Sequence, residues 1–289
     1  MKLPGRLALP EEVVEIAKRL EGAGHETWCV GGAIRDALLG GGRDDVDLAT
    51  AATPEQVQAL FRRTVPVGIR FGTVGVLDRN RHLHEVTTFR RDVSTDGRHA
   101  EVAFGVSLDD DLARRDFTIN AIAYHPLRGE WRDPFDGTAD LGRRLIRAVG
   151  DPAERFREDY LRILRAIRFA CRLDFVIDEP TWRAAIAAAD GLGRLSAERV
   201  RDEWFRSLET ATDLARLVEL WGAVGAAARW LPGLAADYPL AERAPPARDP
   251  VLLTAALCRD SGGALDRLRA SGAEIARAAR IDRSPAAPA

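Results

Sequence analysis

The feature that most constrains the fold of this 289-residue chain is a change of pattern near residue 140. Before that point, short apolar runs with the alternation of strands are mixed with helical segments. After it, long segments of helical periodicity follow one another without a strand pattern of comparable quality. A chain of this length exceeds the usual size of one core. The sequence therefore predicts a mixed α and β unit followed by an all-helical one.

Local signals define several elements of the first half. The clearest is TPEQV at 53–57, where Thr53 is a helix cap, Pro54 takes the first helical position and Gln56 the third. Expected helices cover residues 11–24, 33–39 and 53–57, and expected strands cover residues 27–30, 45–48, 71–78 and 82–90.

Composition excludes several classes of protein. Apolar residues make up 46% and charged residues 30% of the chain, which is globular composition. No apolar run approaches the roughly 18 residues of a membrane span, and the amino terminus lacks a signal-peptide pattern. We therefore expect a cytoplasmic protein without a membrane segment. Cys29, Cys171 and Cys258 are far apart and are expected to be buried reduced thiols.

The distribution of charge points to a phosphate-rich partner for one segment. The net charge of the whole chain is −2, which gives no overall indication of nucleic-acid binding. Residues 141–172, however, contain nine arginines against four acids. We expect this segment to be able to face phosphates.

Three aspartates are crowded into the sequence DDVD at 44–47. The strand period of two places Asp45 and Asp47 on one face and Asp44 on the other. Two carboxylates that point the same way repel each other unless a cation lies between them, and paired hard oxygens suit Mg²⁺. A solvated acidic turn is the alternative for this motif taken alone.

Two further motifs fit a bound nucleoside triphosphate. In GGAIRD, a Gly-Gly turn leads into a helix and presents free backbone N–H groups, with Arg35 one turn in. In LARRDFTINAIAY, Arg114 or Arg115 is suited to triphosphate oxygens and Asp116 to a ribose hydroxyl. Taken singly, the motifs also fit an ordinary strand-to-helix turn and an ordinary element start.

The segment FREDYLRILRAIRFA at 156–170 predicts one amphipathic helix. On it, Asp159 and Arg162 are i,i+3 neighbours, and Arg165 and Arg168 continue the same row. A carboxylate acceptor beside an arginine donor matches cytosine and adenine, whereas uracil and guanine present these groups in reverse. A surface salt bridge within the helix is the alternative.

Four motifs, in this order, resemble the bacterial class II tRNA nucleotidyltransferase and poly(A) polymerase family, which includes the CCA-adding enzymes. GGAIRD with DVDLAT resembles the catalytic motif, RRDFTINAIAY the ribose motif, DPFDGTADL the connecting segment and EDYLRILRAIRF the amino-acid template for bases. The resemblance covers about residues 25–210. It implies an α+β fold: a polymerase-β-like head with a mixed sheet and helices, then a helical neck and body. The implied domains are a head at 1–140, a neck at 141–210 and a body at 211–289 with a truncated or absent tail.

The resemblance also implies a function and a set of site residues. The implied reaction is template-independent addition of CMP and AMP from CTP and ATP to the 3′ end of tRNA, with two Mg²⁺ ions and release of pyrophosphate. Asp45 and Asp47 would be the catalytic metal ligands, and Glu85 is a candidate third carboxylate. The implied nucleotide contacts are Gly32, Arg35, Arg114, Asp159, Arg162, Arg165 and Arg168.

The motifs leave alternatives open. A poly(A) polymerase or an A-adding enzyme of the same family would use the same pocket. Residues 92–105 resemble a flexible loop that CC-only members lack, which favours A addition. From another class, a non-catalytic RNA- or nucleotide-binding module would have no need of paired metal ligands. The oligomeric state and the anchoring of tRNA by so short a carboxy-terminal region stay open.

Overall fold

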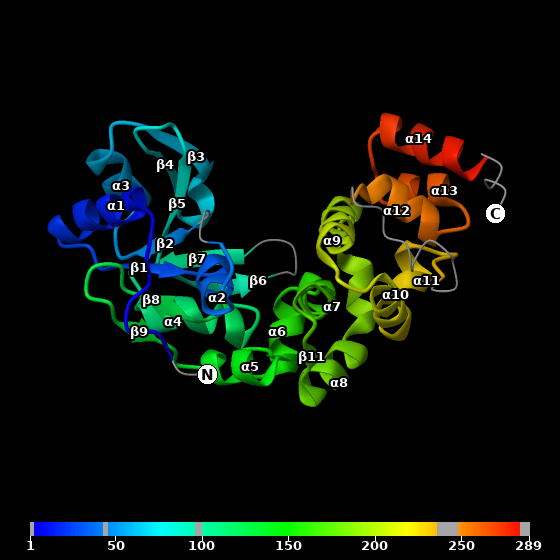
Figure 1. Cartoon of the computed structure of the whole chain (residues 1–289), viewed down its shortest axis with the longest axis horizontal. Coiled ribbons are helices and arrows are strands. Elements are labelled where there is room, and N and C mark those ends of the chain that lie inside the picture. Colours follow the sequence, from blue (N-terminus) through cyan, green and yellow to red (C-terminus); the bar gives the residue numbers. More distant parts are fainter. Residues whose placement is uncertain (1–2, 43–45, 96–99, 236–247, 284–289) are drawn as a thin grey trace. The chain divides into compact units, whose positions relative to one another are not determined.

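The change of sequence pattern near residue 140 coincides with a boundary between two structural units (Figure 1). The computed structural model describes residues 3–42, 46–95, 100–235 and 248–283. The first unit comprises residues 1–143 and 147–150, and the second comprises residues 144–146 and 151–289.

The first unit is built on a mixed sheet of seven strands, as far as its described residues extend, in the order β3-β4-β5-β2-β1-β8-β9. Strand β2 runs parallel to β5, and the other neighbouring pairs are antiparallel. The alternating sequence expected to form strands at 71–78 and 82–90 corresponds to β4 and β5. The strands are β1 (Thr27–Val30), β2 (Asp47–Thr50), β3 (Thr64–Gly68), β4 (Thr73–Leu77), β5 (Leu83–Thr88), β8 (Ala123–Tyr124) and β9 (Trp131–Arg132).

Short helices flank this sheet (Figure 1). The capping prediction for 53–57 is confirmed, because the Thr53 hydroxyl accepts from the Gln56 N–H while the Gln56 side chain accepts from the Thr53 N–H. The helices are α1 (Glu11–Gly22), α2 (Gly32–Leu38), α3 (Pro54–Leu60), α4 (Leu108–Ala113) and α5 (Gly137–Arg143), with single 3₁₀ turns η1 (Ile69–Phe71) and η2 (Thr118–Asn120).

Helix α4 packs against one face of the sheet. Trp28 of β1 and Ala49 of β2 pair directly across the sheet and share a buried apolar cluster with Leu108 and Leu112. Burial of aromatic and aliphatic groups of this kind is the main source of stability of such a layer. The cluster fixes β1 and β2, which carry the glycine turn and the first acidic motif.

Residues 92–105 do not form the expected loop throughout. Strands β6 (Arg90–Thr95) and β7 (Ala100–Phe104) pair in antiparallel register, for example at Arg90 and Phe104. The described backbone of β6 and β7 is therefore a two-stranded ladder, and the resemblance of this segment to the family's flexible loop stays a prediction.

As far as its residues are described, the second unit is helical except for two strands of two residues each, β10 (Leu145–Ile146) and β11 (Val176–Ile177), which pair in parallel. The expectation of an all-helical second half missed this short ladder, because runs of two residues carry no periodic signal. Its helices are α6 (Pro152–Glu158), α7 (Leu161–Leu173), α8 (Glu179–Ala187), η3 (Ala189–Arg194), α9 (Ala197–Thr210), α10 (Leu214–Ala223), α11 (Ala226–Trp230), α12 (Pro250–Leu257), α13 (Ser261–Arg267) and α14 (Gly272–Asp282).

One apolar core joins helices from both segments that were expected to be separate domains. It runs from Phe156 to Leu268 and includes Trp204 of α9 and Trp221 of α10, whose ring centroids lie 4.7 Å apart. The expected boundary between neck and body at residues 210 and 211 stays a prediction. Across the described ranges, the protein contains no helix with the length and apolar character of a membrane span.

Candidate functional site

Two exposed carboxylates lie side by side at one position of the sheet in the first unit. Asp47 is the first residue of β2, and Glu85 lies in β5. The register pairs Leu48 with Val86, so Asp47 and Glu85 occupy the preceding pair of positions in these parallel strands. Neighbours in register point to the same face of a sheet. Asp45, the other predicted metal ligand, lies outside the described residues.

The glycine turn lies against Asp47. Val30, the last residue of β1, pairs with Asp47, so Gly31 follows directly beside the carboxylate. Gly31 has a φ of 81°, a conformation that L side chains rarely adopt. A methyl group added there would lie 3.4 Å from Asp47 Oδ2 and 3.4 Å from Arg115 Nη1. The turn therefore keeps the space between a carboxylate and a guanidinium clear of a side chain.

Arg35 is held inside the first unit. Only 2% of it is exposed; its Nε donates to Asp36 Oδ1 at 2.8 Å and its Nη1 donates to Asn120 Oδ1 at 2.7 Å. Asn120 in turn donates to Asp116 Oδ1 at 2.9 Å. The guanidinium lies close under the turn, because a methyl group on Gly32 would be 3.5 Å from Arg35 Nη2. Its described contacts therefore anchor α2 and the glycine turn to η2.

A buried aspartate fixes the two adjacent arginines. Arg114 donates from Nε and Nη2 to Asp111 Oδ1, at 3.1 and 2.9 Å, and Arg115 Nη2 donates to Asp111 Oδ2 at 3.2 Å. Burial acts to raise the pKa of the Asp111 carboxyl, but Arg114 and Arg115 outweigh it and hold the pKa below its ordinary value. Charge-assisted bonds of this kind orient guanidinium groups well. Arg115 Nη1 lies on the side of Gly31 that also faces Asp47 Oδ2.

The predicted template helix is interrupted. Helix α6 ends at Glu158 and α7 begins at Leu161, so the expectation of one helix over 156–170 is wrong. Asp159 has an extended backbone, with φ −154° and ψ 105°, and its Oδ1 accepts from the Leu161 N–H at 3.0 Å. Aspartate side chains compete in this way with helical hydrogen bonds.

Asp159 and Arg162, on the two sides of the interruption, bind different residues. Asp159 Oδ2 accepts from Arg199 Nη2 at 2.7 Å, and Arg162 Nη1 donates to Glu158 Oε2 at 2.6 Å and to the Arg155 carbonyl at 3.1 Å. These contacts do not include the salt bridge between Asp159 and Arg162 that was the alternative interpretation. Both residues are partly buried rather than spread on the surface.

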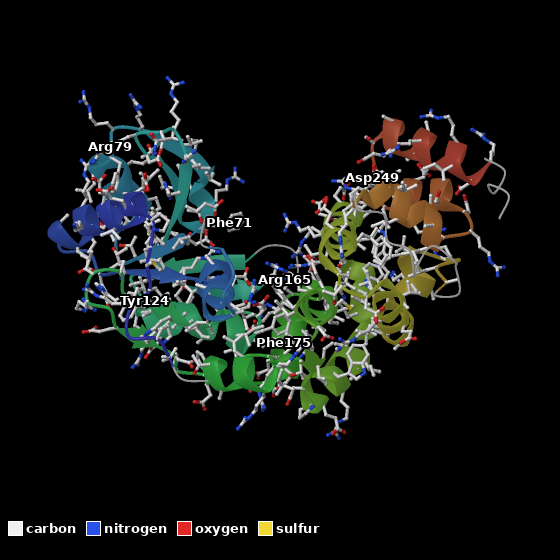
Figure 2. All side chains as sticks on the ribbon, in the orientation of Figure 1. Phe71, Arg79, Tyr124, Arg165, Phe175 and Asp249 are labelled. Carbon is white, nitrogen blue, oxygen red and sulfur yellow. The ribbon has the colours of Figure 1, made fainter. Side chains whose placement is uncertain are left out.

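The two remaining arginines of the row differ in environment. Arg165, labelled in Figure 2, lies over the Phe169 ring at 5.4 Å. Arg168 is buried and donates to the Glu203 carboxylate of α9, which is also buried. Arg168 therefore connects α7 to α9 inside the second unit, a placement that helical spacing alone did not reveal.

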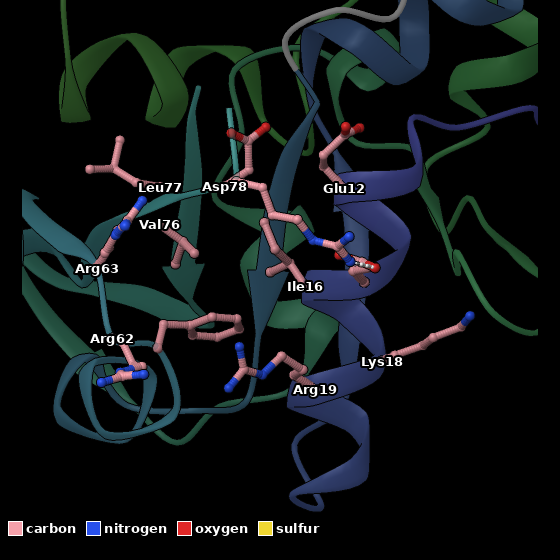
Figure 3. A pocket seen from close by; sticks show the side chains of 12 residues that line it. Glu12, Ile16, Lys18, Arg19, Arg62, Arg63, Val76, Leu77 and Asp78 are labelled. Atoms are coloured by element: carbon pink, nitrogen blue, oxygen red, sulfur yellow. Dashed lines mark hydrogen bonds and ion pairs between the residues drawn. The ribbon is translucent and has the colours of Figure 1, made fainter. Parts of the chain in front are cut away.

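A cavity of the first unit lies away from these residues. It holds about 980 Å³ between α1, the segment after α3 and the end of β4. Figure 3 shows Arg19, Arg62 and Arg63 around it, and Arg19 lies over the Phe61 ring at 4.9 Å. Within the described residues, its lining includes none of the predicted site residues.

Comparisons with known proteins agree with this architecture. A family model described as "Poly A polymerase head domain" matches residues 27–147. A solved structure of the Bacillus stearothermophilus CCA-adding enzyme in complex with CTP is 37% identical, with a TM-score of 0.83, and the match covers 94% of this chain and 69% of that one. The chain belongs to the tRNA nucleotidyltransferase and poly(A) polymerase family.

Curated relatives place the chain within this family at similar identity. The CCA-adding enzyme of Leuconostoc mesenteroides is 45% identical over 217 residues, which is 73% of this chain and 53% of that enzyme. That of Levilactobacillus brevis is 47% identical over 205 residues, 69% of this chain and 51% of that enzyme. The chain thus spans about half the length of the curated relatives it matches. A Thermotoga maritima CCA-adding enzyme complexed with tRNA, 23% identical with a TM-score of 0.73 over 96% of this chain and 71% of that one, shows the same fold.

For this family member, sequence reasoning missed the residues that hold the site together. Asp111 had a detectable signal, since it precedes Arg114 and Arg115 by three and four residues in one helical turn. Asn120 lies in the RRDFTINAIAY motif, but its contact with Arg35 had no sequence signal, nor had that of Arg199 with Asp159, because these residues meet only through the fold. The described residues include no group of three histidines, cysteines or acids arranged to hold a metal ion.

Proposed function

We propose that the protein adds CMP and AMP from CTP and ATP to the 3′ end of tRNA, without a nucleic-acid template and with release of pyrophosphate. The observation that carries the proposal is the juxtaposition of Asp47, the Gly31 turn and Arg115 in the first unit of a member of this family. A carboxylate, free backbone N–H groups and a guanidinium are what a metal-bound triphosphate requires.

The donor set suits a hard divalent cation, and the family uses divalent metal ions. Asp47 and Glu85 present exposed carboxylates from neighbouring strands, and hard oxygen ligands of this kind favour Mg²⁺. We therefore propose that Asp45, Asp47 and Glu85 hold Mg²⁺. When bound, the metal would lower the pKa of the RNA 3′-hydroxyl and neutralise charge on the phosphates.

The protein groups around the carboxylates have separate tasks in this proposal. The N–H groups at Gly31 and Gly32 bind phosphate oxygens, and Arg114 and Arg115 neutralise the departing pyrophosphate. Asp111 holds both guanidinium groups in place. Arg35 was expected to contact the triphosphate itself; its burial instead supports an indirect role, in which it fixes the turn that does so.

In this proposal, residues of the second unit select the base. Asp159 would accept from the exocyclic amine of cytosine or adenine and Arg162 would donate to the ring nitrogen. The contacts of Arg162 with Glu158 and the Arg155 carbonyl leave it held in position, as a selective donor must be. Arg165 stays a candidate contact, whereas the buried bond to Glu203 supports a positioning role for Arg168.

The alternatives lead to different reaction products. A poly(A) polymerase or an A-adding enzyme would extend RNA with AMP alone, and a binding module would retain RNA without extending it. If tRNA is the substrate, the protein acts where tRNA matures, which in a bacterium is the cytoplasm.

The test is incubation of the purified protein with tRNA that lacks the last three, two or one nucleotides of CCA. Each of the four labelled nucleoside triphosphates is supplied separately and together, and products are resolved at single-nucleotide length. Addition of C, C and A in that order, ending at CCA, is expected. Unlimited AMP addition would favour the poly(A) alternative. RNA binding with no transfer by any nucleotide would favour the binding module.

A further inference from the structure

Part of one face of the sheet in the first unit is open and apolar. Val65 and Val67 of β3 and Leu83 of β5 are 38%, 43% and 45% exposed. Phe71, labelled in Figure 2, adds an exposed ring in the turn between β3 and β4. We call Val65, Val67 and Leu83 the open strand face. Exposed apolar groups gathered in this way mark binding surfaces more often than isolated ones do.

The open strand face is continuous with the carboxylates. Val65 pairs with Gly75 and Gly75 pairs with Glu85, so all three positions lie on one face. A methyl group on Gly75 would lie 2.5 Å from Leu83 Cδ1 and 2.8 Å from Val67 Cγ2. The two side chains therefore extend over Gly75 and form an unbroken apolar surface that ends at Glu85.

Strands β1 and β2 are covered on this face. On the same face, Trp28 and Ala49 are buried against α4. On the opposite face of β4 and β5, Val74 and Val86 are buried as well. Val65, Val67 and Leu83 thus lie on an uncovered part of this face, on the side of Asp47 and Glu85 away from β1.

The order of strands assigns this surface to one reactant. Attacking and leaving oxygens of a nucleotidyl transfer lie on opposite sides of the α-phosphorus. Strand β1, with its glycine turn, lies on one side of β2, and β5, β4 and β3 lie on the other. If the triphosphate binds at the turn, the attacking 3′-hydroxyl must approach from the side of β5. We propose that the open strand face binds the 3′-terminal nucleotides of the acceptor RNA, an inference that rests on the proposed function.

The chemistry of the face suits an unpaired RNA end. The exposed Phe71 ring is of the kind on which bases stack without regard to sequence, and the aliphatic groups of the open strand face offer apolar surface to bases and riboses. The hydroxyls of Thr73 and Thr87, 3.0 Å apart, add a polar spot beside Glu85 on the same face. Arg70, in the turn after β3, is exposed and makes no ion pair with the residues that the structure describes. It offers a cation to a backbone phosphate at the edge of the apolar surface.

Charge variants of Leu83 test the proposal. Leu83→Glu and Leu83→Lys are compared with wild type in steady-state transfer, with the RNA and the nucleotide varied separately. Leu83→Glu is expected to raise KM for RNA about tenfold through repulsion of phosphates, while KM for the nucleotide stays within about twofold. Leu83→Lys should not raise KM for RNA. The matched controls are Ile186→Glu and Ile186→Lys, at an apolar side chain of α8 that is 47% exposed.

A second measurement uses Arg70. Arg70→Ala should reduce the dependence of RNA binding on salt by about 0.7 in the slope of log K against log salt, the value for one phosphate of a single strand. An unchanged slope, or equal KM values for RNA in both Leu83 variants, would overturn the proposal. A loss of self-association by both variants would show that a second copy covers the face and would also overturn it. A wild-type protein that transfers no nucleotide contradicts the proposed function first, whereas active variants with unaltered KM contradict this inference alone.

Discussion

Asp159 and Arg199 form an ion pair between the break after α6 and the first turn of α9, with 2.7 Å between Oδ2 and Nη2. The Asp159 carboxylate therefore does not continue the helical row of arginines in α7. It binds a residue 40 positions further along the chain. A base that binds Asp159 would meet a group whose orientation is already fixed.

Asp159→Ala is expected to relax base selection. Loss of the acceptor removes the penalty on the carbonyl groups of UTP and GTP, worth about 1–3 kcal/mol or roughly 10- to 100-fold in relative kcat/KM. Transfer of all four nucleotides onto tRNA lacking its last one or two residues measures the effect. The control, Arg199→Gln, breaks the ion pair but keeps the acceptor and should keep the preference for CTP and ATP. An unchanged preference in Asp159→Ala would remove this residue from the template.

Asp47→Asn is expected to abolish transfer with every nucleotide alike. The substitution keeps the shape of the side chain but removes a charged metal ligand, so folding and RNA binding should persist. Single-turnover rates with CTP and ATP provide the measurement. Asp109→Asn serves as control, at an exposed aspartate of the same unit that binds Arg132. Retention of more than about a tenth of the wild-type rate, a barrier change below about 1.4 kcal/mol, would contradict the assignment.

Arg168→Met is expected to destabilise the second unit. It leaves the buried Glu203 carboxylate without its arginine, and loss of one partner of a buried ion pair costs about 3–5 kcal/mol. Urea unfolding measures the change, and the double variant Arg168→Met with Glu203→Leu should recover much of it. If Arg168→Met unfolds like wild type but loses nucleotide affinity, a direct contact with substrate is the better description.

The decrease in folding stability at acid pH should depend on Asp111. Because its pKa is lowered in the folded protein, the ionised carboxyl stabilises the fold above its ordinary pKa of about 3.9. This contribution is lost as the pH falls through the folded-state pKa. Asp111→Asn should therefore be less stable than wild type at pH 7, with a difference that shrinks below about pH 4. Thermal unfolding across this range checks it, with Asp190→Asn at an exposed site as control. A constant difference would mean that the carboxylate charge contributes nothing.

Elements governed by neighbouring residues could be predicted from the sequence. The cap of α3 depends on Thr53 and Gln56, three residues apart, and both of its hydrogen bonds are present. Strands β4 and β5 alternate because one of their faces is buried, which leaves a period of two in the sequence. The glycine turn beside Asp47 likewise follows from two short motifs that the pairing of β1 with β2 brings together.

Contacts between distant residues could not be predicted. Arg35 meets Asn120 across 85 positions, and Arg168 meets Glu203 across 35. Helical spacing predicted that Arg168 lies in one row with Asp159. Spacing within one helix does not reveal which residues of another helix contact that row. The break at Asp159 depends on its side chain replacing a helical hydrogen bond, an outcome that propensity alone does not decide.

The proposed contacts of Asp159 and Arg162 with a base limit how many nucleotides this site can distinguish. One acceptor and one donor sort the four bases into two classes, so the pair makes a single binary choice for each nucleotide. Cytosine and adenine would both be accepted. In a protein that completes CCA, the choice between C and A at each step and the end of synthesis would therefore depend on the growing RNA end and the space it occupies, because these two side chains would not distinguish cytosine from adenine.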